Sequence, residues 1–107
     1  MNLLLADDDE SIAMVARLGL RRAGCTVTIV DDGAKALAEA RRTHYDAIVL
    51  DWQLPEMDGI DVCRALMNDP DWTRVPIVFL TGARGVVFKP FDPMTVGERV
   101  KAIIEAR

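Results

Sequence analysis

The sequence predicts an α/β fold with a parallel sheet, because short apolar segments alternate with segments of helical character. The apolar runs lack the polar alternation of a sheet with one solvated face, which is typical of strands buried on both sides. Helices are the usual links between parallel strands. A chain of 107 residues can bury a substantial core in one domain, and we assign residues 1–107 to a single domain.

The first half of the chain alternates strand, helix, strand and helix. Residues 3–6 are uniformly apolar and predict a buried strand, and the helix over 11–23 is followed by Gly24, a helix stop signal. The β-branched segment 26–30 predicts a second strand, and 34–42 is rich in helix-favouring residues. The side chains expected to face the core are Ile12, Val15, Ala16 and Gly19 in the first helix, and Ala34, Leu37 and Ala38 in the second.

The second half continues the alternation. Residues 47–50 predict a third strand, and turn-forming residues follow at 55–59. Apolar runs at 77–80 and 86–88 predict the fourth and fifth strands. Helices are expected at 60–67, with Val62, Cys63, Leu66 and Met67 facing the core, and at 94–106, after the capping pair Asp92-Pro93.

Polar residues stand at the carboxyl ends of these strands, where α/β folds place their sites. They are Asp7, Asp8 and Asp9 after the first strand, Asp51 after the third, Thr81 after the fourth and Lys89 after the fifth. Several carboxylates at one sheet edge repel one another. These groups offer oxygen ligands, and no His or Cys stands beside them. A hard divalent cation such as Mg²⁺ is therefore the expected counter-charge.

Such a set of residues suits phosphoryl transfer. A carboxylate beside the cation can attack a phosphoryl group and become an acyl phosphate. The transferred group then needs its remaining charge compensated, which a threonine hydroxyl and a lysine ammonium group can do. Asp51, Thr81 and Lys89 are therefore the candidate reacting residues.

Four segments together resemble the receiver domains of two-component response regulators. They are the apolar strand and acidic pair at 4–9, the strand and loop at 48–59, the strand at 76–81 and the Lys-Pro-Phe segment at 89–91. The resemblance extends over residues 3–106. It implies a flavodoxin-like, doubly wound sheet of five parallel strands in the order 2-1-3-4-5.

The resemblance also implies roles for the reacting residues. Asp51 would accept a phosphoryl group from a sensor histidine kinase or a histidine phosphotransfer protein. Thr81 would hydrogen-bond that group and Lys89 would pair with it. The domain would catalyse only its own phosphorylation and dephosphorylation, and it would signal by switching conformation.

A Mg²⁺ site is implied at the same place. Asp8 and Asp51 would bind the ion directly, together with the backbone carbonyl of Gln53, and Asp7 would act through a metal-bound water. A degenerate receiver, acting as an unphosphorylated interaction or dimerisation module, is the alternative. An aspartate-nucleophile phosphatase of the haloacid-dehalogenase type is disfavoured, because its second aspartate would stand where this chain has Gln53.

The sequence departs from the family between Thr81 and Lys89. Seven residues, 82–88, separate them, whereas the family usually places about twenty there, enough for a helix and a strand. The fourth helix of the family is therefore expected either to be lacking or to be missing from this sequence. Three explanations stay open: exchange of the last strand and helix in a homodimer, an antiparallel fifth strand, or a segment of the protein omitted from this sequence.

The composition bears on possible partners and on the location of the protein. Thirteen basic and 17 acidic residues give a net charge of −4, which predicts no direct nucleic-acid binding. No apolar run reaches the roughly 18–20 residues of a membrane span, so no membrane contact is expected. Neither a leader-like start nor a disulfide pattern is visible, and Cys25 and Cys63 are expected as thiols, which predicts a cytoplasmic protein.

Overall fold

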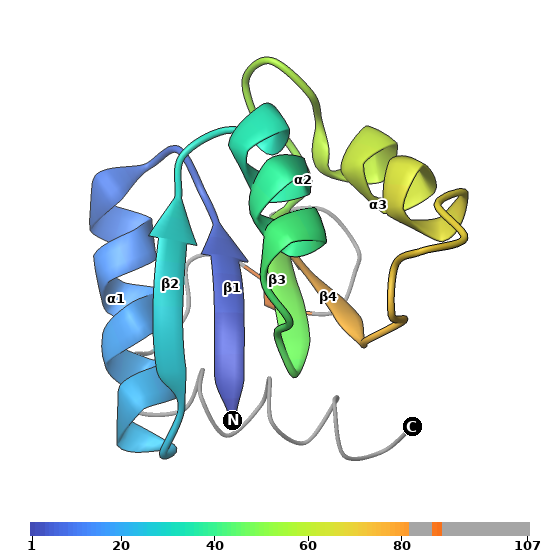
Figure 1. Ribbon diagram of the computed structural model, residues 1–107. Helices are drawn as coiled ribbons and strands as arrows, with labels where there is room; N and C mark the ends of the chain where they lie inside the picture. Colours follow the sequence, from blue (N-terminus) through green and yellow to red (C-terminus); the bar gives the residue numbers. More distant parts are fainter. Residues whose placement is uncertain (82–86, 89–107) are drawn as a thin grey trace.

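A computed structural model describes residues 1–81 and 87–88 of the chain, and in them five strands form one parallel sheet (Figure 1). The strand order is β2-β1-β3-β4-β5, which confirms the predicted topology. Each of the first four strands runs within one residue of its predicted range. The strands are β1 (Asn2–Ala6), β2 (Thr26–Val30), β3 (Ala47–Asp51), β4 (Ile77–Thr81) and β5 (Val87–Phe88).

Each helix of the described part begins after an aspartate that caps it. The helices are α1 (Glu10–Arg22), α2 (Gly33–Arg42) and α3 (Gly59–Met67). Their caps are Asp9, Asp32 and Asp58, and each carboxylate accepts a hydrogen bond from backbone N–H groups in the first turn. Such caps satisfy N–H groups that have no partner within the helix, which explains why each helix starts one residue before its predicted range.

The helices form a layer on each face of the sheet. In Figure 1, α1 lies on one side, and α2 and α3 lie next to each other on the other side. Two buried clusters correspond to these layers: α1 packs with Leu3, Leu5 and Val49, and α2 and α3 pack with Leu4 and Leu50. Connections between parallel strands are right-handed, so the face that a helix covers depends on the direction in which the chain moves across the sheet. The chain moves one way from β1 to β2 and the other way afterwards, so α1 lies on one face and α2 and α3 lie on the other.

Three residues predicted to face inward are exposed: Ala34 and Ala38 in α2 and Met67 in α3. The buried positions are Ala13, Ala16, Gly19 and Leu20 in α1, Gly33, Ala36 and Ala40 in α2, and Gly59, Val62 and Leu66 in α3. The predicted stripe of α2 was therefore wrong at Ala34 and Ala38, whereas Leu37 is partly buried and packs against the core as predicted. Ala34 and Ala38 lie on the opposite side of that helix from Ala36 and Ala40, so the hydrophobic contrast that would reveal its inner face is missing.

The fifth strand is parallel to the fourth, so the antiparallel alternative is wrong. Leu80 pairs with Val87 and Thr81 pairs with Phe88 in the same chain. Five intervening residues can span at most about 17 Å. That length suffices because β5 meets only the last two residues of β4, so the chain need not return to the start of the strand. Lys89 and the helix predicted at 94–106 lie outside the described residues.

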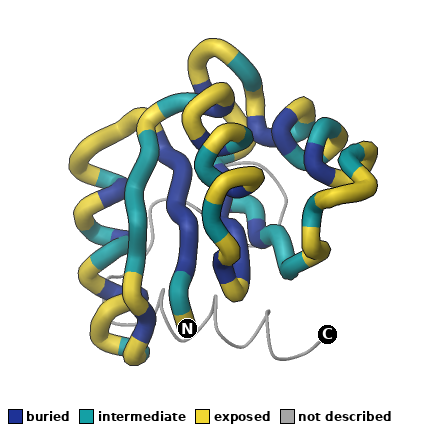
Figure 2. Tube along the Cα trace, viewed as in Figure 1, coloured by how far each residue is buried: buried dark blue, intermediate teal, exposed yellow. Residues whose placement is uncertain are grey.

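The centre of the sheet is closed to solvent. Leu3, Leu4 and Leu5 in β1 and Val49 and Leu50 in β3 are fully buried, as Figure 2 shows for both strands. These strands are covered on both faces, which explains their uninterrupted apolar sequence. In the described residues we find no helix with the length and apolar character required to cross a bilayer.

Gly24 ends α1 in a left-handed conformation, with φ at +90°. We expect Gly24→Ala to lower the free energy of unfolding by about 1–2 kcal/mol, because a Cβ atom is strained at positive φ. No atom lies within 4 Å of the added Cβ, so the cost is conformational and not a clash. Gly24→Asn should cost less, since asparagine tolerates this region. Urea denaturation would measure both, and equal costs would contradict this explanation.

Candidate functional site

Three carboxylates meet at the carboxyl edge of the sheet. Asp7 and Asp8 follow β1, and Asp51 is the last residue of β3. The two strands are neighbours, with Ala6 opposite Leu50, so the residues that follow these two lie side by side. Asp7, Asp8 and Asp51 each offer a carboxylate oxygen, and these oxygens all lie within 4.8 Å of one another.

The three acids differ in exposure and in their hydrogen bonds. Asp7 is 2% exposed and accepts a hydrogen bond of 3.0 Å from the backbone N–H of Asp9. Asp51 is partly buried and accepts one of 3.4 Å from the backbone N–H of Gln53, whereas Asp8 is exposed. The cluster therefore has a fixed, buried inner wall and an open side from which an ion or a phosphoryl donor can approach.

The donor set fits a hard cation. Negative charges this close repel one another, and a buried carboxylate also loses hydration, so a bound divalent ion would offset two costs at once. All three ligand groups are carboxylates. Mg²⁺ and Ca²⁺ prefer such oxygen ligands, whereas softer metals do not. Asp9, the third acid after β1, caps α1 instead of joining the cluster.

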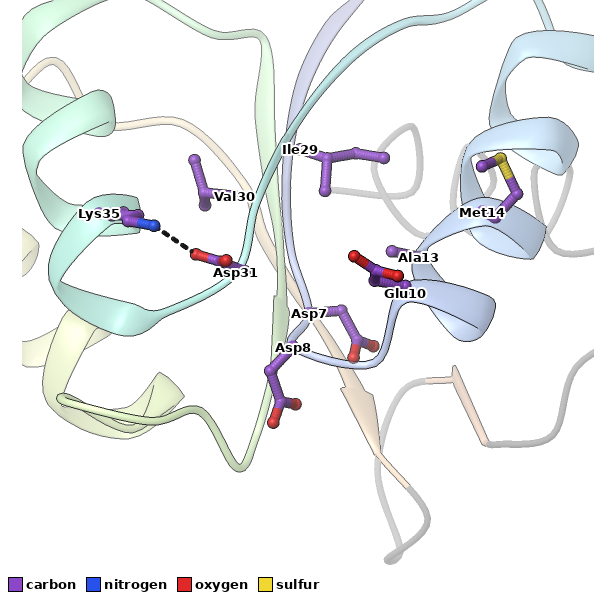
Figure 3. A pocket seen from close by; sticks show the side chains of 9 residues that line it. All are labelled: Asp7, Asp8, Glu10, Ala13, Met14, Ile29, Val30, Asp31 and Lys35. Carbon is purple, nitrogen blue, oxygen red and sulfur yellow. Dashed lines mark hydrogen bonds and ion pairs between the residues drawn. The ribbon is translucent and has the colours of Figure 1, made fainter.

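A cleft of about 570 Å³ opens beside the cluster, between α1 and the start of α2 (Figure 3). Asp7 and Asp8 line it together with Glu10, Asp31 and Lys35. The ammonium group of Lys35 contacts the Asp31 carboxylate at 2.8 Å, as the dashed line in Figure 3 marks. This hydrogen bond lowers the pKa of Asp31 and raises that of Lys35. Lys35, in the first turn of α2, was not among the predicted site residues.

The loop after Asp51 is held by two close backbone approaches. The N–H of Gly33, at the start of α2, donates to the carbonyl of Pro55 at 3.1 Å, and that of Gly59 donates to Trp52 at 3.0 Å. A Cβ on Gly33 would lie 1.6 Å from the carbonyl oxygen of Met57. Only glycine fits there. The close approach to Met57 and the hydrogen bond to Pro55 therefore hold the loop after Asp51 against the start of α2.

Of the remaining predicted site residues, the structure describes Thr81 and Gln53 but not Lys89. Thr81 is the last residue of β4 and stands one position beyond Leu80, the partner of Asp51 in the neighbouring strand. Gln53 is exposed and follows Asp51 by two residues, with its N–H directed at the Asp51 carboxylate. Lys89 lies outside the described residues, so its position relative to the cluster stays a prediction.

Together these features define a class: doubly wound α/β proteins with an acidic, cation-fitting site at the carboxyl edge of a parallel sheet. The family model described as "Response regulator receiver domain" matches residues 3–101. The chain belongs to this family, as its sequence motifs predicted.

Curated relatives agree with this assignment. The chain is 39% identical over 114 residues to the DNA-binding response regulator MtrA of Mycolicibacterium smegmatis, covering 94% of the chain and 49% of the relative. It is 38% identical over 116 residues to the regulatory protein PhoP of Bacillus subtilis, named for alkaline phosphatase synthesis, covering 95% and 48%. The chain thus spans about half the length of the curated relatives it matches.

Solved structures confirm the flavodoxin-like receiver fold. The chemotaxis response regulator CheY4 of Vibrio cholerae superposes with a TM-score of 0.85 at 27% identity, covering 95% of this chain and 97% of that one. The receiver domain of a sensor histidine kinase from Pseudomonas aeruginosa, solved with magnesium coordinated in its active-site cleft, gives 0.83 at 30% identity and covers 98% and 94%.

Proposed function

We propose that residues 1–107 form a phosphoacceptor domain in which Asp51 takes a phosphoryl group from a sensor histidine kinase or a histidine phosphotransfer protein. The observation that carries the proposal is the approach of Asp51 to Asp7 and Asp8, within 4.8 Å, at the open edge of a receiver-family sheet. A carboxylate in that setting is both exposed enough to react and next to the groups that would hold a cation.

The transfer is a displacement at phosphorus. A carboxylate oxygen of Asp51 forms the new P–O bond while the P–N bond to the donor histidine breaks, and the departing imidazole takes up a proton. The product is an acyl phosphate on Asp51. The Thr81 hydroxyl donates a hydrogen bond to the transferred group and the Lys89 ammonium group pairs with it, so that its charge is compensated.

The residues that would hold the ion are the carboxylates of Asp8 and Asp51 and the backbone carbonyl of Gln53, with Asp7 acting through a metal-bound water. The all-oxygen donor set supports Mg²⁺ as the ion. When bound, Mg²⁺ offsets the repulsion between these carboxylates and the oxygens of the incoming phosphoryl group.

The output is a shift between two conformations that the phosphoryl group biases. In relatives named as DNA-binding regulators, the matched half is joined to further chain. With a net charge of −4, this chain is proposed to contact protein partners and not nucleic acid or membrane, and to act in the cytoplasm. Its catalysis is confined to its own phosphorylation and dephosphorylation.

Intact-mass spectrometry tests the proposal directly. The protein would be incubated with acetyl phosphate, a small phosphoryl donor, with and without Mg²⁺. We expect a mass gain of one phosphoryl group that requires Mg²⁺ and is reversed by hydroxylamine, which cleaves acyl phosphates. No gain from either acetyl phosphate or a phosphohistidine donor would overturn the proposal.

The short segment between Thr81 and Lys89 favours a second candidate, a degenerate receiver that works only through protein contacts. Five residues, 82–86, join β4 to β5, and Lys89 follows almost at once. If this connection misplaces Lys89, the acyl phosphate would not form although the carboxylates are clustered. Mg²⁺ binding without phosphoryl uptake is the result that would identify this candidate.

Replacing Asp8 with asparagine should remove most of the stabilisation by Mg²⁺. At ten times its dissociation constant, a bound ion adds about 1.4 kcal/mol, or roughly 6–11 °C in Tm for a domain of this size. Asp8→Asn loses one ligand charge, so we expect the Mg²⁺-dependent rise in Tm to fall below a third of the wild-type value in calorimetry. Asp9→Asn is the matched control, because asparagine caps α1 as well as aspartate does. Equal Mg²⁺ responses in the two variants would contradict the site.

A further inference from the structure

One residue in the loop after Asp51 has a strained backbone. Glu56 has a φ of +68°, and among the described residues it is the one non-glycine residue in the left-handed region. This conformation is costly for a residue with a Cβ atom, and glutamate is not one of the residue types that adopt it readily. Glu56 is exposed, and within the described part of the chain its carboxylate forms no ion pair that could offset the cost. The reason for the strain must therefore lie in the backbone.

The backbone closes a tight turn at this residue. The N–H of Met57 donates a hydrogen bond of 2.7 Å to the carbonyl of Pro55, two residues earlier. Such a bond across a single residue with positive φ is characteristic of the γ-turn of the rare, strained kind. We refer to residues 55–57 as the Glu56 turn. A strained turn persists only where the surrounding structure holds it in place.

The start of α2 holds the Glu56 turn from one side. The N–H of Gly33 donates to the same Pro55 carbonyl at 3.1 Å. The Gly33 backbone also approaches the Met57 carbonyl, so closely that a Cβ would lie 1.6 Å from its oxygen. The first N–H groups of a helix have no partner within the helix, and the turn supplies one for Gly33. In Figure 1 the chain between β3 and α3 arches past this end of α2. The turn therefore fixes the loop against α2.

The peptide groups around Gln53 are held between this turn and the end of β3. On the side of β3, the Trp52 N–H donates to a carbonyl of β4 at 3.2 Å, and the Trp52 carbonyl accepts from the N–H of Gly59 at 3.0 Å. On the side of the turn, Leu54 is 9% exposed and belongs to the buried cluster under α2 and α3. The N–H of Gln53 points to the Asp51 carboxylate, at 3.4 Å. A short segment held at both ends cannot rotate its peptide groups freely, so the direction of the Gln53 carbonyl is restricted.

We propose that the Glu56 turn positions the backbone carbonyl of Gln53 for the bound cation. This inference rests on the proposed function, in which that carbonyl is an ion ligand beside Asp8 and Asp51. A carboxylate can follow an ion by rotating its side chain, whereas a carbonyl moves only with the backbone. Mg²⁺ requires near-ideal octahedral geometry with ligands at about 2.0–2.1 Å, so a loosely held carbonyl would bind it weakly. Glu56 is thus a positioning residue, which acts through its backbone conformation and not through its carboxylate.

Substitutions at position 56 test the proposal by isothermal titration calorimetry with Mg²⁺. Glycine fits the left-handed turn and a β-branched side chain does not, so Glu56→Val should open the turn in part. We expect Glu56→Val to raise the Mg²⁺ dissociation constant about threefold or more, because affinity falls with the fraction of molecules in the binding conformation. Glu56→Gly should bind Mg²⁺ within about twofold of the wild type. Its Tm should rise by about 2–6 °C, because the strain is removed.

The matched control is Glu56→Gln, which removes the same negative charge but keeps a backbone preference close to that of glutamate. Its Mg²⁺ dissociation constant measures the electrostatic contribution alone, and the difference between Glu56→Val and Glu56→Gln measures the contribution of the turn. Equal dissociation constants in these two variants would overturn the proposal, even if Glu56→Val had the lower Tm, because the turn would then serve stability only. A wild-type chain that binds no Mg²⁺ would overturn it as well, together with the proposed cation site.

The other side of the contact gives an independent test. Gly33→Ala would push the Met57 carbonyl away from α2, so it should weaken Mg²⁺ binding as Glu56→Val does. In both variants, phosphoryl uptake from acetyl phosphate should need about threefold or more Mg²⁺ to reach its half-maximal rate, with a maximal rate within about twofold of the wild type. A lower maximal rate with an unchanged Mg²⁺ requirement would refute the positioning role. If the wild type binds Mg²⁺ but takes up no phosphoryl group, the proposed phosphoacceptor function fails, and the calorimetric series still decides the role of the turn.

Discussion

Asp51→Asn is expected to abolish phosphoryl uptake from acetyl phosphate. The side-chain amide has nearly the size of the carboxylate, so the fold at the end of β3 should be kept. The amide oxygen, however, carries no charge and is a poor nucleophile, so the P–O bond of the acyl phosphate cannot form at this position. Intact-mass spectrometry should show no gain under conditions that modify the wild-type chain completely.

The control for this substitution is Asp58→Asn. Asp58 is an exposed acid seven positions after Asp51, and it caps α3 by accepting a hydrogen bond from the N–H of Asp61. Asparagine is an equally good cap, so this variant loses one negative charge near the site without losing the helix start. It should be phosphorylated normally. Full uptake by Asp51→Asn would place the acceptor elsewhere, and equal loss in both variants would point to the overall charge instead.

The sequence was sufficient to predict the carboxylate cluster, because its position follows from topology. The carboxyl ends of parallel strands lie at one edge, so acids at the ends of β1 and β3 must meet if these strands are neighbours. The family resemblance supplied that strand order, and the structure then brought Asp7, Asp8 and Asp51 together. Asp9 shows the limit of the rule, because its use as a helix cap depends on where α1 begins.

Other features depend on tertiary contacts that no local pattern reveals. The inner face of α2 was mispredicted at Ala34 and Ala38 because alanines lie on two opposite sides of the helix, and only packing against the sheet selects Ala36 and Ala40. Lys35 reaches the cleft because α2 starts beside the end of β2. The exposure of Met67 at the end of α3 is another such feature, because the apolar side chain and its helical spacing alone predicted burial.

The glycine at the start of α3 shows how closely the site and the fold are coupled. A Cβ on Gly59 would lie 2.4 Å from the carbonyl oxygen of Asp51 and 3.3 Å from the ring of Phe79. Alanine normally stabilises a helix relative to glycine by about 1 kcal/mol, so intrinsic preference alone predicts a gain. The contact with Asp51 is with backbone, which cannot move aside as a flexible side chain would.

We therefore expect Gly59→Ala to lower the free energy of unfolding by about 2–3 kcal/mol, or roughly 10–20 °C in Tm. Because the displaced carbonyl belongs to Asp51, phosphoryl uptake should also slow at temperatures where the variant is folded. Gly24→Ala is the comparison, since the same atom is added where nothing lies within 4 Å, and it should leave uptake unchanged. Two results would contradict this explanation: a Gly59→Ala variant as stable as the wild type, or one that loses stability but reacts at the wild-type rate. Either would mean that the position of the end of β3 does not depend on this close approach.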